Sequence, residues 1–297
     1  MSNFVIREKC PVCDSTESEI LLSKFFSDES IFNFIDNFYN GKIKKNDIKN
    51  NKYILSKCKK CSLIFQKEIL DNESMNKLYE EFINPEKSLM KRERSDSKYF
   101  EALYSDCMTA TKICERKFNL IPKKLNFLDF GMGWGHWLIA AKACGVNGYG
   151  SEISEERINF AKKNCVKVID PFEDIYQEYF HFISTDQVFE HLSDPNKVLG
   201  GLVKSLKKGG ILKIFIPTTS QAFLRLKILG KKWTPINDAF HPLEHINSFN
   251  YKSLCKLTKR HNLYPLKIND AHTNLFLQGK SRLKLALGVN RWYFTKI

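Results

Sequence analysis

The segment from Leu128 to Trp137 constrains this 297-residue chain most strongly. An apolar run ends in Asp129, three glycines follow at alternate positions, and apolar residues then resume at helical spacing. This order predicts a strand, a tight turn and the start of a helix. Glycine lets the backbone pass close to a ligand and adopt positive φ, and a helix N-terminus offers free N–H groups and the positive end of a dipole. A glycine pattern alone is weak evidence, so the residues that follow decide its meaning.

Strands and helices alternate after this loop. The sequence predicts strands at 148–153, 166–169, 181–187, 211–216 and 264–268, a remaining strand within 273–277, and a basic, aromatic tail at 279–297 that packs on the domain or frays. Alternation of this kind predicts an α/β fold with a mostly parallel sheet and right-handed crossovers. The acids Asp129, Glu152, Asp170 and Asp186 stand at predicted strand ends, where ligands of such sheets bind.

Glu152 and the glycine spacing narrow the type of ligand. Glu152 follows the loop by about 20 residues, the usual place of a ribose-binding carboxylate in a nucleotide-binding βαβ unit. The loop reads G-x-G-x-G rather than the G-x-G-x-x-G of pyrophosphate cofactors. Acids at every strand end suit a cofactor with a positive centre and no phosphate.

At this point the chain resembles the class I S-adenosylmethionine (SAM)-dependent methyltransferases. The matching pieces are residues 128–135, Glu152, residues 182–192, Asp194-Pro195 and residues 206–217. The resemblance implies a Rossmann-like sheet with helices on both faces and SAM as the cofactor. It implies cofactor contacts at Asp129, Phe130, Gly131, Gly133, Trp134, Glu152, Ile153, Asp170, Asp186 and Gln187.

The resemblance also gives roles to several of these residues. Gly131 and Gly133 would approach the methionine part, Glu152 the ribose, and Ile153 the adenine. Asp170 is expected near the adenine edge, although Phe172 or Glu173 could serve instead, and Asp186 and Gln187 are expected beside the sulfonium. Asp170 and Asp186 could equally be helix-capping or loop residues.

Four cysteines predict a zinc module ahead of this domain. Cys10-Pro-Val-Cys13 and Cys58-Lys-Lys-Cys61 are two C-x2-C pairs, a spacing that brings two thiolates onto one ion. Two such pairs complete a closed, tetrahedral and therefore structural zinc site. The long gap between the pairs weakens the pattern, and four unrelated buried cysteines or a redox pair are the alternatives.

The zinc module narrows the family resemblance. Cysteine pairs ahead of the domain, with residues 61–65 after the second, resemble the zinc-ribbon-bearing small-molecule methyltransferases, many of which modify sugars, nucleotide-sugars or glycans. The chain lacks room for the long C-terminal domain of the larger sugar C-methyltransferases, so we expect O-methyl transfer. An alcohol needs a base, and histidine is the usual choice. Residues 240–249 resemble a stretch bordering the substrate pocket, which makes His245, then His241, the candidate catalytic bases.

Composition sets the expected partners and location. The net charge is +14, but 38 of the 47 basic residues are lysines spread along the chain, whereas specific nucleic-acid contacts favour arginine. We therefore expect a small-molecule or glycan acceptor, anionic in character, and no nucleic acid. No apolar region follows the first eight residues, and no run of about 20 apolar residues occurs. A cytoplasmic protein without a membrane span is expected, and its oligomeric state stays open.

The expected domains are consecutive: a zinc-ribbon-like module at 1–70, a helical connection at 71–120 and the methyltransferase domain at 121–297. The charge run at 91–94 is expected to be a solvated loop or part of a lid. Two other functions remain open. One is an RNA or protein methyltransferase, although residues 184–187 lack the N/D-P-P-Y/F motif of base-amino methyltransferases. The other is a non-catalytic module that binds SAM and zinc.

Overall fold

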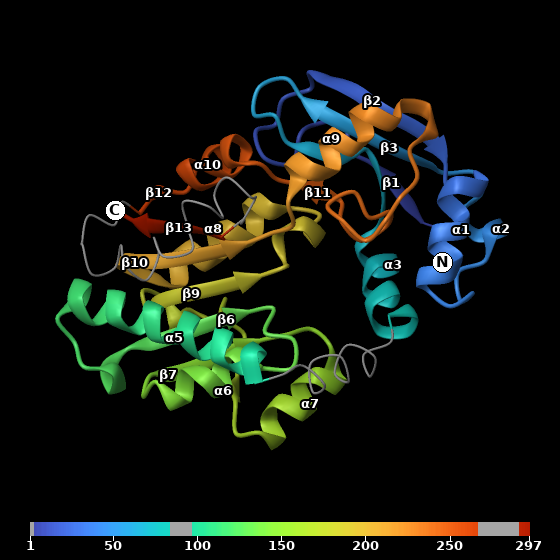
Figure 1. Ribbon diagram of the computed structural model, residues 1–297. Helices are drawn as coiled ribbons and strands as arrows, with labels where there is room; N and C mark the ends of the chain where they lie inside the picture. The colour runs from blue at the N-terminus through green and yellow to red at the C-terminus, as the bar shows by residue number, and fades with distance from the viewer. Residues whose placement is uncertain (1–2, 84–96, 267–290) are drawn as a thin grey trace. The chain divides into compact units, whose positions relative to one another are not determined.

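The computed structural model describes residues 3–83, 97–266 and 291–297 (Figure 1). The described residues form two compact units. Unit 1 takes its residues from Met1–Asn84, Phe189–Asn196 and Ile216–Leu257, and unit 2 takes them from Pro85–Val188, Lys197–Phe215 and Thr258–Ile297. The chain passes between the units repeatedly, whereas the domains expected from the sequence are consecutive. The physical reason is that residues 216–257 pack and pair with the N-terminal segment.

Unit 1 is built on a small antiparallel sheet. Its elements are β1 (Phe4–Ile6), β2 (Ser18–Phe25), α1 (Glu29–Phe38), α2 (Lys45–Ile48), β3 (Lys52–Cys58), β4 (Ile64–Gln66), β5 (Glu68–Leu70), α3 (Asn72–Lys77), the π-helical turn η1 (Leu78–Phe82), η4 (Phe189–His191), α9 (Thr219–Leu229), η5 (Gly230–Lys232), β11 (Asn247–Ser248) and most of α10 (Tyr251–Lys259). Within the described residues, the sheet order is β11-β4-β3-β2, and β1 pairs with β5. The pairing of β11 with β4 joins the late segment to the N-terminal one.

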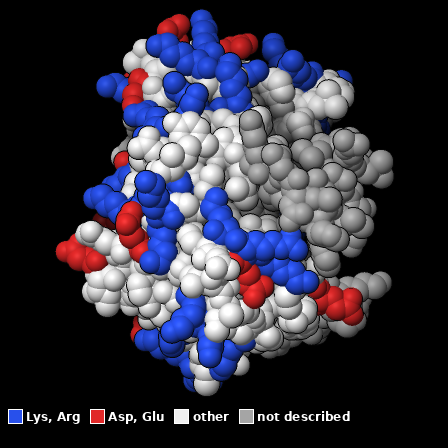
Figure 2. Space-filling view, turned by 90° about the vertical axis from the view of Figure 1, so that its left-hand side faces the viewer, with Lys and Arg blue, Asp and Glu red and all other residues white. Residues whose placement is uncertain are grey.

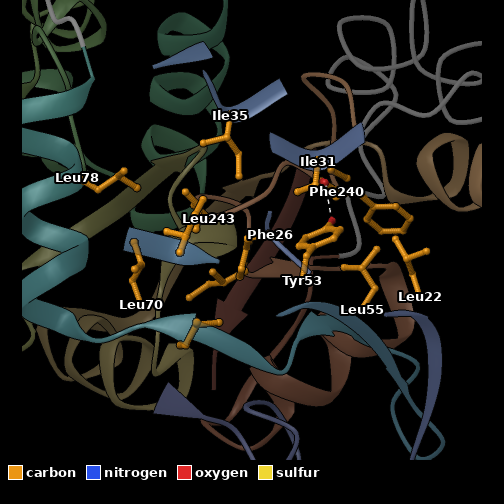
Figure 3. Packing of buried hydrophobic residues seen from close by; sticks show 14 of the residues in the cluster. Leu22, Phe26, Ile31, Ile35, Tyr53, Leu55, Leu70, Leu78, Phe240 and Leu243 are labelled. Atoms are coloured by element: carbon orange, nitrogen blue, oxygen red, sulfur yellow. Dashed lines mark hydrogen bonds between the residues drawn. The ribbon is translucent and has the colours of Figure 1, made fainter. Parts of the chain in front are cut away.

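One apolar core holds unit 1 together (Figure 3). Ile31 and Ile35 lie one helical turn apart on α1 and are fully buried, which explains why this Phe-rich segment is helical. The hydroxyl of Tyr53 on β3 donates to the carbonyl of Phe240 at 2.6 Å. Trp233 stacks on Tyr53 with ring centroids 5.9 Å apart. Tyr53 and Phe240 are 187 positions apart in the sequence. Segments distant in the sequence therefore share this core.

Unit 2 alternates strands and helices as the sequence predicts. Its elements are α5 (Ser97–Phe118), η2 (Pro122–Lys124), β6 (Asn126–Phe130), α6 (His136–Ala143), β7 (Asn147–Ser151), α7 (Glu155–Lys163), β8 (Lys167–Val168), η3 (Asp174–Tyr176), β9 (Phe180–Asp186), α8 (Pro195–Ser205), β10 (Leu206–Phe215), β12 (Leu263–Pro265) and β13 (Arg291–Lys296). Across the described residues, seven strands form one sheet in the order β12-β13-β10-β9-β6-β7-β8. The predicted α/β, Rossmann-like fold class is confirmed.

The strand order places a switch point beside β6. The chain proceeds from β6 to β7 and β8 on one side, and β9 and β10 lie on the other side. These five strands pair in parallel, whereas β13 runs antiparallel to both β10 and β12. In open α/β sheets, ligands bind at the carboxyl ends of the strands near such a switch.

The end of the chain differs from the sequence expectation. Residues 291–296 form β13, a full member of the sheet, whereas the sequence predicts a tail at 279–297. The strand expected within 273–277 and the charge run at 91–94 lie outside the described residues. Among the residues that are described, no helix combines the length and apolarity needed to cross a membrane.

Candidate functional site

The carboxyl edge of the unit 2 sheet aligns three of the predicted cofactor residues. Phe130 on β6 pairs with Ser151 on β7 and with Thr185 on β9. The residue after each of these three is Gly131, Glu152 and Asp186, respectively. The parallel register therefore brings the start of the glycine loop and the two acids to one row at the switch point.

The glycine loop has a backbone that only glycine adopts easily. Gly131 has φ of +73°, and a Cβ atom there would lie 2.5 Å from Cγ2 of Val188. Gly133 and Gly135 also have positive φ, at +55° and +77°, and Gly135 is the N-cap of α6. The amide of Gly131 donates to the carbonyl of Ser151 at 2.8 Å, which fixes the loop to β7. The loop can approach a ligand closely because it carries no side chains at these positions.

Glu152 ties the loop to the next helix. Its Oε2 accepts the amide of Gly133 at 2.9 Å, and its Oε1 accepts the amides of Ile153 at 2.9 Å and Ser154 at 3.1 Å. Nη1 of Arg157 lies 3.9 Å from Oε2, and the Glu152 side chain is only 6% exposed. Ser154 occupies the N-cap position of α7, but its own side chain makes no capping hydrogen bond. The Glu152 carboxylate instead accepts the amides of the two residues that precede the helix.

The remaining predicted residues differ in exposure. Ile153 is 69% exposed, which leaves an apolar surface beside Glu152. Asp170 is exposed and its Oδ1 accepts the amide of Phe172 at 2.9 Å. Asp186 and Gln187 are exposed at the end of β9, and Gln187 has φ of +57°. These side chains are open to solvent, where a bound molecule can reach them.

The aromatic residues near the loop point to packing roles as well. Trp134 is 2% exposed and its ring lies 5.1 Å from that of Phe160 on α7. Asp129 is also buried, and the ring of Phe130 lies 5.8 Å from that of Phe172. The structure thus brings all ten predicted cofactor residues onto the same sheet edge or its first loop, with Trp134 and Asp129 facing the interior.

The four predicted zinc ligands converge in unit 1. The sulfur atoms of Cys10, Cys13, Cys58 and Cys61 all lie within 4.8 Å of one another. The Cys10–Cys61 and Cys13–Cys58 sulfur pairs are each 3.5 Å apart. Sulfurs that share a tetrahedral zinc at about 2.3 Å lie about 3.8 Å apart, so the cluster fits this ion.

The two cysteine pairs also share one backbone pattern. Asp14 and Ser62 each follow the second cysteine of a pair, have φ of +56° and +65°, and donate their amides to the carbonyl of the first cysteine at 3.0 Å. The amides of Cys10 and Cys58 donate to the carbonyls of Ser15 and Leu63 at 2.9 and 2.8 Å. This repetition indicates two equivalent knuckles rather than four unrelated cysteines.

Both candidate catalytic bases lie in a buried histidine cluster of unit 1. The rings of His241 and His245 are 5.4 Å apart, and that of His191 is 5.0 Å from His245. Nδ1 of His241 lies 2.7 Å from the carbonyl oxygen of residue 242, and Nδ1 of His245 lies 2.6 Å from that of residue 238. Nδ1 of His191 lies 3.0 Å from the carbonyl oxygen of residue 244. Because a carbonyl only accepts, each Nδ1 carries the proton and each Nε2 presents a lone pair.

Burial keeps these imidazoles neutral. Loss of hydration lowers the pKa of His241 to about 3 and that of His245 to about 4. Burial, with a further contribution from His245, lowers the pKa of His191 to about 3. Nε2 of His241 is buried and has no hydrogen-bond partner among the described residues. The three imidazoles therefore stay neutral at pH 7 and can accept hydrogen bonds there.

Two buried amides hold the histidine-bearing segments. The side chain of Gln66 on β4 donates to the carbonyls of His241 at 3.0 Å and His245 at 3.1 Å. The side chain of Asn247 donates to the carbonyls of Phe189 and Leu192, at 3.2 and 2.7 Å, and so fixes η4. Both amides are fully buried, so the cluster rests on a rigid scaffold.

Comparison with known proteins identifies the domain. The sequence profile of a methyltransferase domain matches residues 102–268, which is more than half of the chain. The chain belongs to this methyltransferase family. The resemblance to the class I SAM-dependent methyltransferases found from the sequence is thereby confirmed. No curated protein matches the methyltransferase chain in sequence.

Solved structures with the same fold are distant in sequence. The plantazolicin methyltransferase BpumL in complex with SAH is 16% identical, with a TM-score of 0.52, and the match covers 75% of this chain and 93% of that one. The plantazolicin methyltransferase BamL, in complex with a triazolic desmethylPZN analog and SAH, is 15% identical, with a TM-score of 0.51 and coverage of 74% and 94%. At this identity the likeness concerns the fold.

Sequence reasoning missed several residues of the methyltransferase chain that accompany the predicted sites. Glu190 and His191 lie with His245 in one group. Both fall in the 182–192 stretch that resembles the methyltransferases, but that resemblance assigns neither of them a role in a site. Gln66 and Asn247 carry no sequence signal, because the backbone carbonyls that they hold are 55 to 179 positions away and only the fold brings them together.

Figure 2 shows lysines and arginines interspersed with uncharged residues and some acids, as the spread of lysines in the sequence predicts.

Proposed function

We propose that this chain is a SAM-dependent methyltransferase that transfers a methyl group to a hydroxyl of a sugar, nucleotide-sugar, glycan or related secondary metabolite. The row of Gly131, Glu152 and Asp186 at the switch point carries the cofactor part of the proposal. A glycine loop backed by carboxylates suits ribose hydroxyls and a positive sulfonium. SAH, the product that SAM becomes after losing its methyl group, is present in the BpumL and BamL structures, and this supports SAM here.

The buried histidine cluster supports O-methyl transfer. Transfer from a sulfonium is an in-line displacement, so the chain must align the acceptor oxygen about 3 Å behind the methyl carbon and exclude water. The hydroxyl proton must leave as the new C–O bond forms. His245, and after it His241, are proposed as the base, because both present an unprotonated Nε2 at neutral pH. A lowered pKa makes each a weak base that is always in the accepting form.

Methyl transfer from tritium-labelled SAM tests this function. The acceptor panel contains nucleotide-sugars, oligosaccharides, a peptide and an RNA, each with the wild-type chain and the His245→Gln and His241→Gln variants. We expect label in a carbohydrate hydroxyl and at least a hundredfold slower transfer in one of the two variants. Label in the peptide or the RNA alone would contradict the proposed acceptor, and equal rates in all three proteins would contradict the histidine base.

A structural zinc ion in the four-cysteine cluster is part of the same proposal. Four thiolates would hold the ion in a closed site and join the loop around Cys10 to the β3–β4 hairpin. We expect the Cys13→Ser and Cys58→Ser variants each to contain about one zinc per chain less than the wild type by elemental analysis. Cys165→Ser is the control, because Cys165 is exposed and outside the cluster. Equal zinc content in all four proteins would contradict the cysteine site.

A further inference from the structure

A second group of metal-ligand side chains lies in unit 1, apart from the four cysteines. One carboxylate oxygen of Glu190 and one ring nitrogen each of His191 and His245 lie within 4.8 Å of one another. Glu190 is 1% exposed and His245 is 9% exposed. Two imidazoles and one carboxylate are a donor set that binds first-row divalent transition metals and leaves further coordination positions open.

The hydrogen bonds of both histidines orient them as metal ligands. Nδ1 of His191 donates to the carbonyl of Glu244 at 3.0 Å, and Nδ1 of His245 donates to the carbonyl of Asp238 at 2.6 Å. Metal-binding histidines nearly always donate their second ring nitrogen to a carbonyl or carboxylate in this way, which fixes the ring and the tautomer. The Nε2 lone pair of each ring is thus left unprotonated and able to bind a metal ion.

The backbone around the group is already fixed. Glu190 and His191 belong to η4, which Asn247 holds through the carbonyls of Phe189 and Leu192. His245 lies on a loop that Gln66 holds, because the side-chain amide of Gln66 donates to the backbone carbonyl of His245 at 3.1 Å. Ligand atoms at about 2.1 Å from a tetrahedral ion lie about 3.4 Å apart, so small side-chain movements would complete the site.

From this arrangement we infer that Glu190, His191 and His245 bind a divalent first-row transition metal ion. Metal binding itself is independent of the methyltransferase activity. The consequence of metal binding for catalysis rests on the proposed function. An ion bound to Nε2 of His245 would leave His241 as the candidate base whose Nε2 can take the hydroxyl proton. The open positions on the ion would suit an oxygen donor of the acceptor.

Manganese titration followed by electron paramagnetic resonance tests the site. Mn²⁺ is the probe because it is paramagnetic and does not favour thiolates, whereas zinc would also bind the cysteine cluster. The signal of free Mn²⁺ in the presence of the chain measures the bound fraction. We expect one Mn²⁺ per chain in the wild type and at least tenfold weaker binding in Glu190→Gln and in His191→Gln.

Two further variants separate ligand loss from misfolding. Glu190→Asp keeps the carboxylate and should bind Mn²⁺ more tightly than Glu190→Gln, although both change the same buried position. His261→Gln, in unit 2, should bind Mn²⁺ as the wild type does. The inference is overturned if the wild type binds no Mn²⁺ at millimolar concentration. It is also overturned if Glu190→Gln and His191→Gln bind Mn²⁺ as tightly as the wild type does. SAM binding measured on the same samples reports separately on the proposed function.

Discussion

At the scale of single residues, the Glu152 carboxylate both accepts backbone hydrogen bonds and is predicted to bind the ribose of the cofactor. Oε1 already accepts two amides, from Ile153 and Ser154, whereas Oε2 accepts one, from Gly133. Each carboxylate oxygen has two lone pairs, so Oε2 keeps room for one hydroxyl donor. Binding both ribose hydroxyls, as expected from the sequence, requires one of the amides to give up its place. Ribose binding is therefore expected to rearrange the amide contacts of Glu152.

His181 gives a pH dependence to unit 2. It is 4% exposed, its Nδ1 accepts the amide of Asn126 at 3.0 Å, and its ring packs against Phe118. Burial and the nearby charge of Lys207 lower its pKa to about 4. The unfolded chain binds a proton near pH 6.5, so the stabilisation is present above that pH and is lost as pH falls toward 4.

Between pH 7 and pH 5, we expect the unfolding free energy of the wild type to fall by roughly 2 kcal/mol more than that of the His181→Gln variant. Chemical denaturation of both proteins at the two pH values measures this difference. A glutamine side chain cannot take up a proton, so the unfolding of the variant depends on pH only through the other groups. An identical pH dependence in the two proteins would show that folding does not lower the pKa of His181.

At the scale of elements, a buried ion pair joins α5 to the central sheet. Nζ of Lys213 on β10 lies 2.5 Å from Oδ2 of Asp106 on α5, and the two side chains are 4% and 8% exposed. The indole of Trp137 donates to the same oxygen at 2.8 Å, and Arg291 of β13 lies 3.5 Å from Oδ1. Burial alone would lower the pKa of Lys213, but the Asp106 carboxylate outweighs this and raises it.

Breaking this pair from one side should be costly. The Lys213→Met variant leaves a buried carboxylate without its main partner, and we expect a loss of about 3–5 kcal/mol in unfolding free energy. The double variant Asp106→Asn with Lys213→Met keeps an acceptor for Trp137 and removes both charges, so it should recover most of that loss. Urea denaturation of the two variants checks this. A double variant less stable than the single one would contradict the pairing.

The sequence predicted the elements better than their partners. Period and glycine signals located β6, β7, β9 and the start of α6 to within a few residues, because these elements depend on local patterns. The sequence did not predict that β13 closes the sheet between β10 and β12, since its basic residues are typical of a tail. Lys213 likewise interrupts an apolar strand without indicating its partner. That partner, Asp106, is more than 100 positions away, and such pairs follow from packing that no local pattern encodes.

The candidate sites show the same difference. The cysteine pairs and the glycine loop were predictable, because their spacing determines their geometry. The grouping of Glu190, His191 and His245 was not, because it depends on β11 pairing with β4 and on Asn247 reaching η4. The family resemblance of residues 240–249 pointed to His245 and His241, and their tautomers became evident only from the carbonyl oxygens beside Nδ1.

At the scale of the whole molecule, the chain builds two units with different chemistry from interleaved segments. Unit 2 holds the glycine loop and its row of acids, and unit 1 holds the cysteine cluster and the histidines. Each unit has its own apolar core. The proposed cofactor and the proposed proton acceptor therefore belong to separately packed parts of one chain, so cofactor binding can be tested at unit 2 residues without altering the histidines.

Isothermal titration with SAM tests the central claim most directly, in the wild-type chain, in Glu152→Ala and in Glu156→Ala. Glu156 is an exposed acid in the first turn of α7 and serves as the control. Loss of a charged hydrogen bond of about 1.5–3 kcal/mol predicts affinity at least tenfold lower in Glu152→Ala. We expect one SAM per chain, bound equally well by the wild type and Glu156→Ala. An absence of binding at millimolar SAM, or equal affinity in Glu152→Ala, would contradict the account.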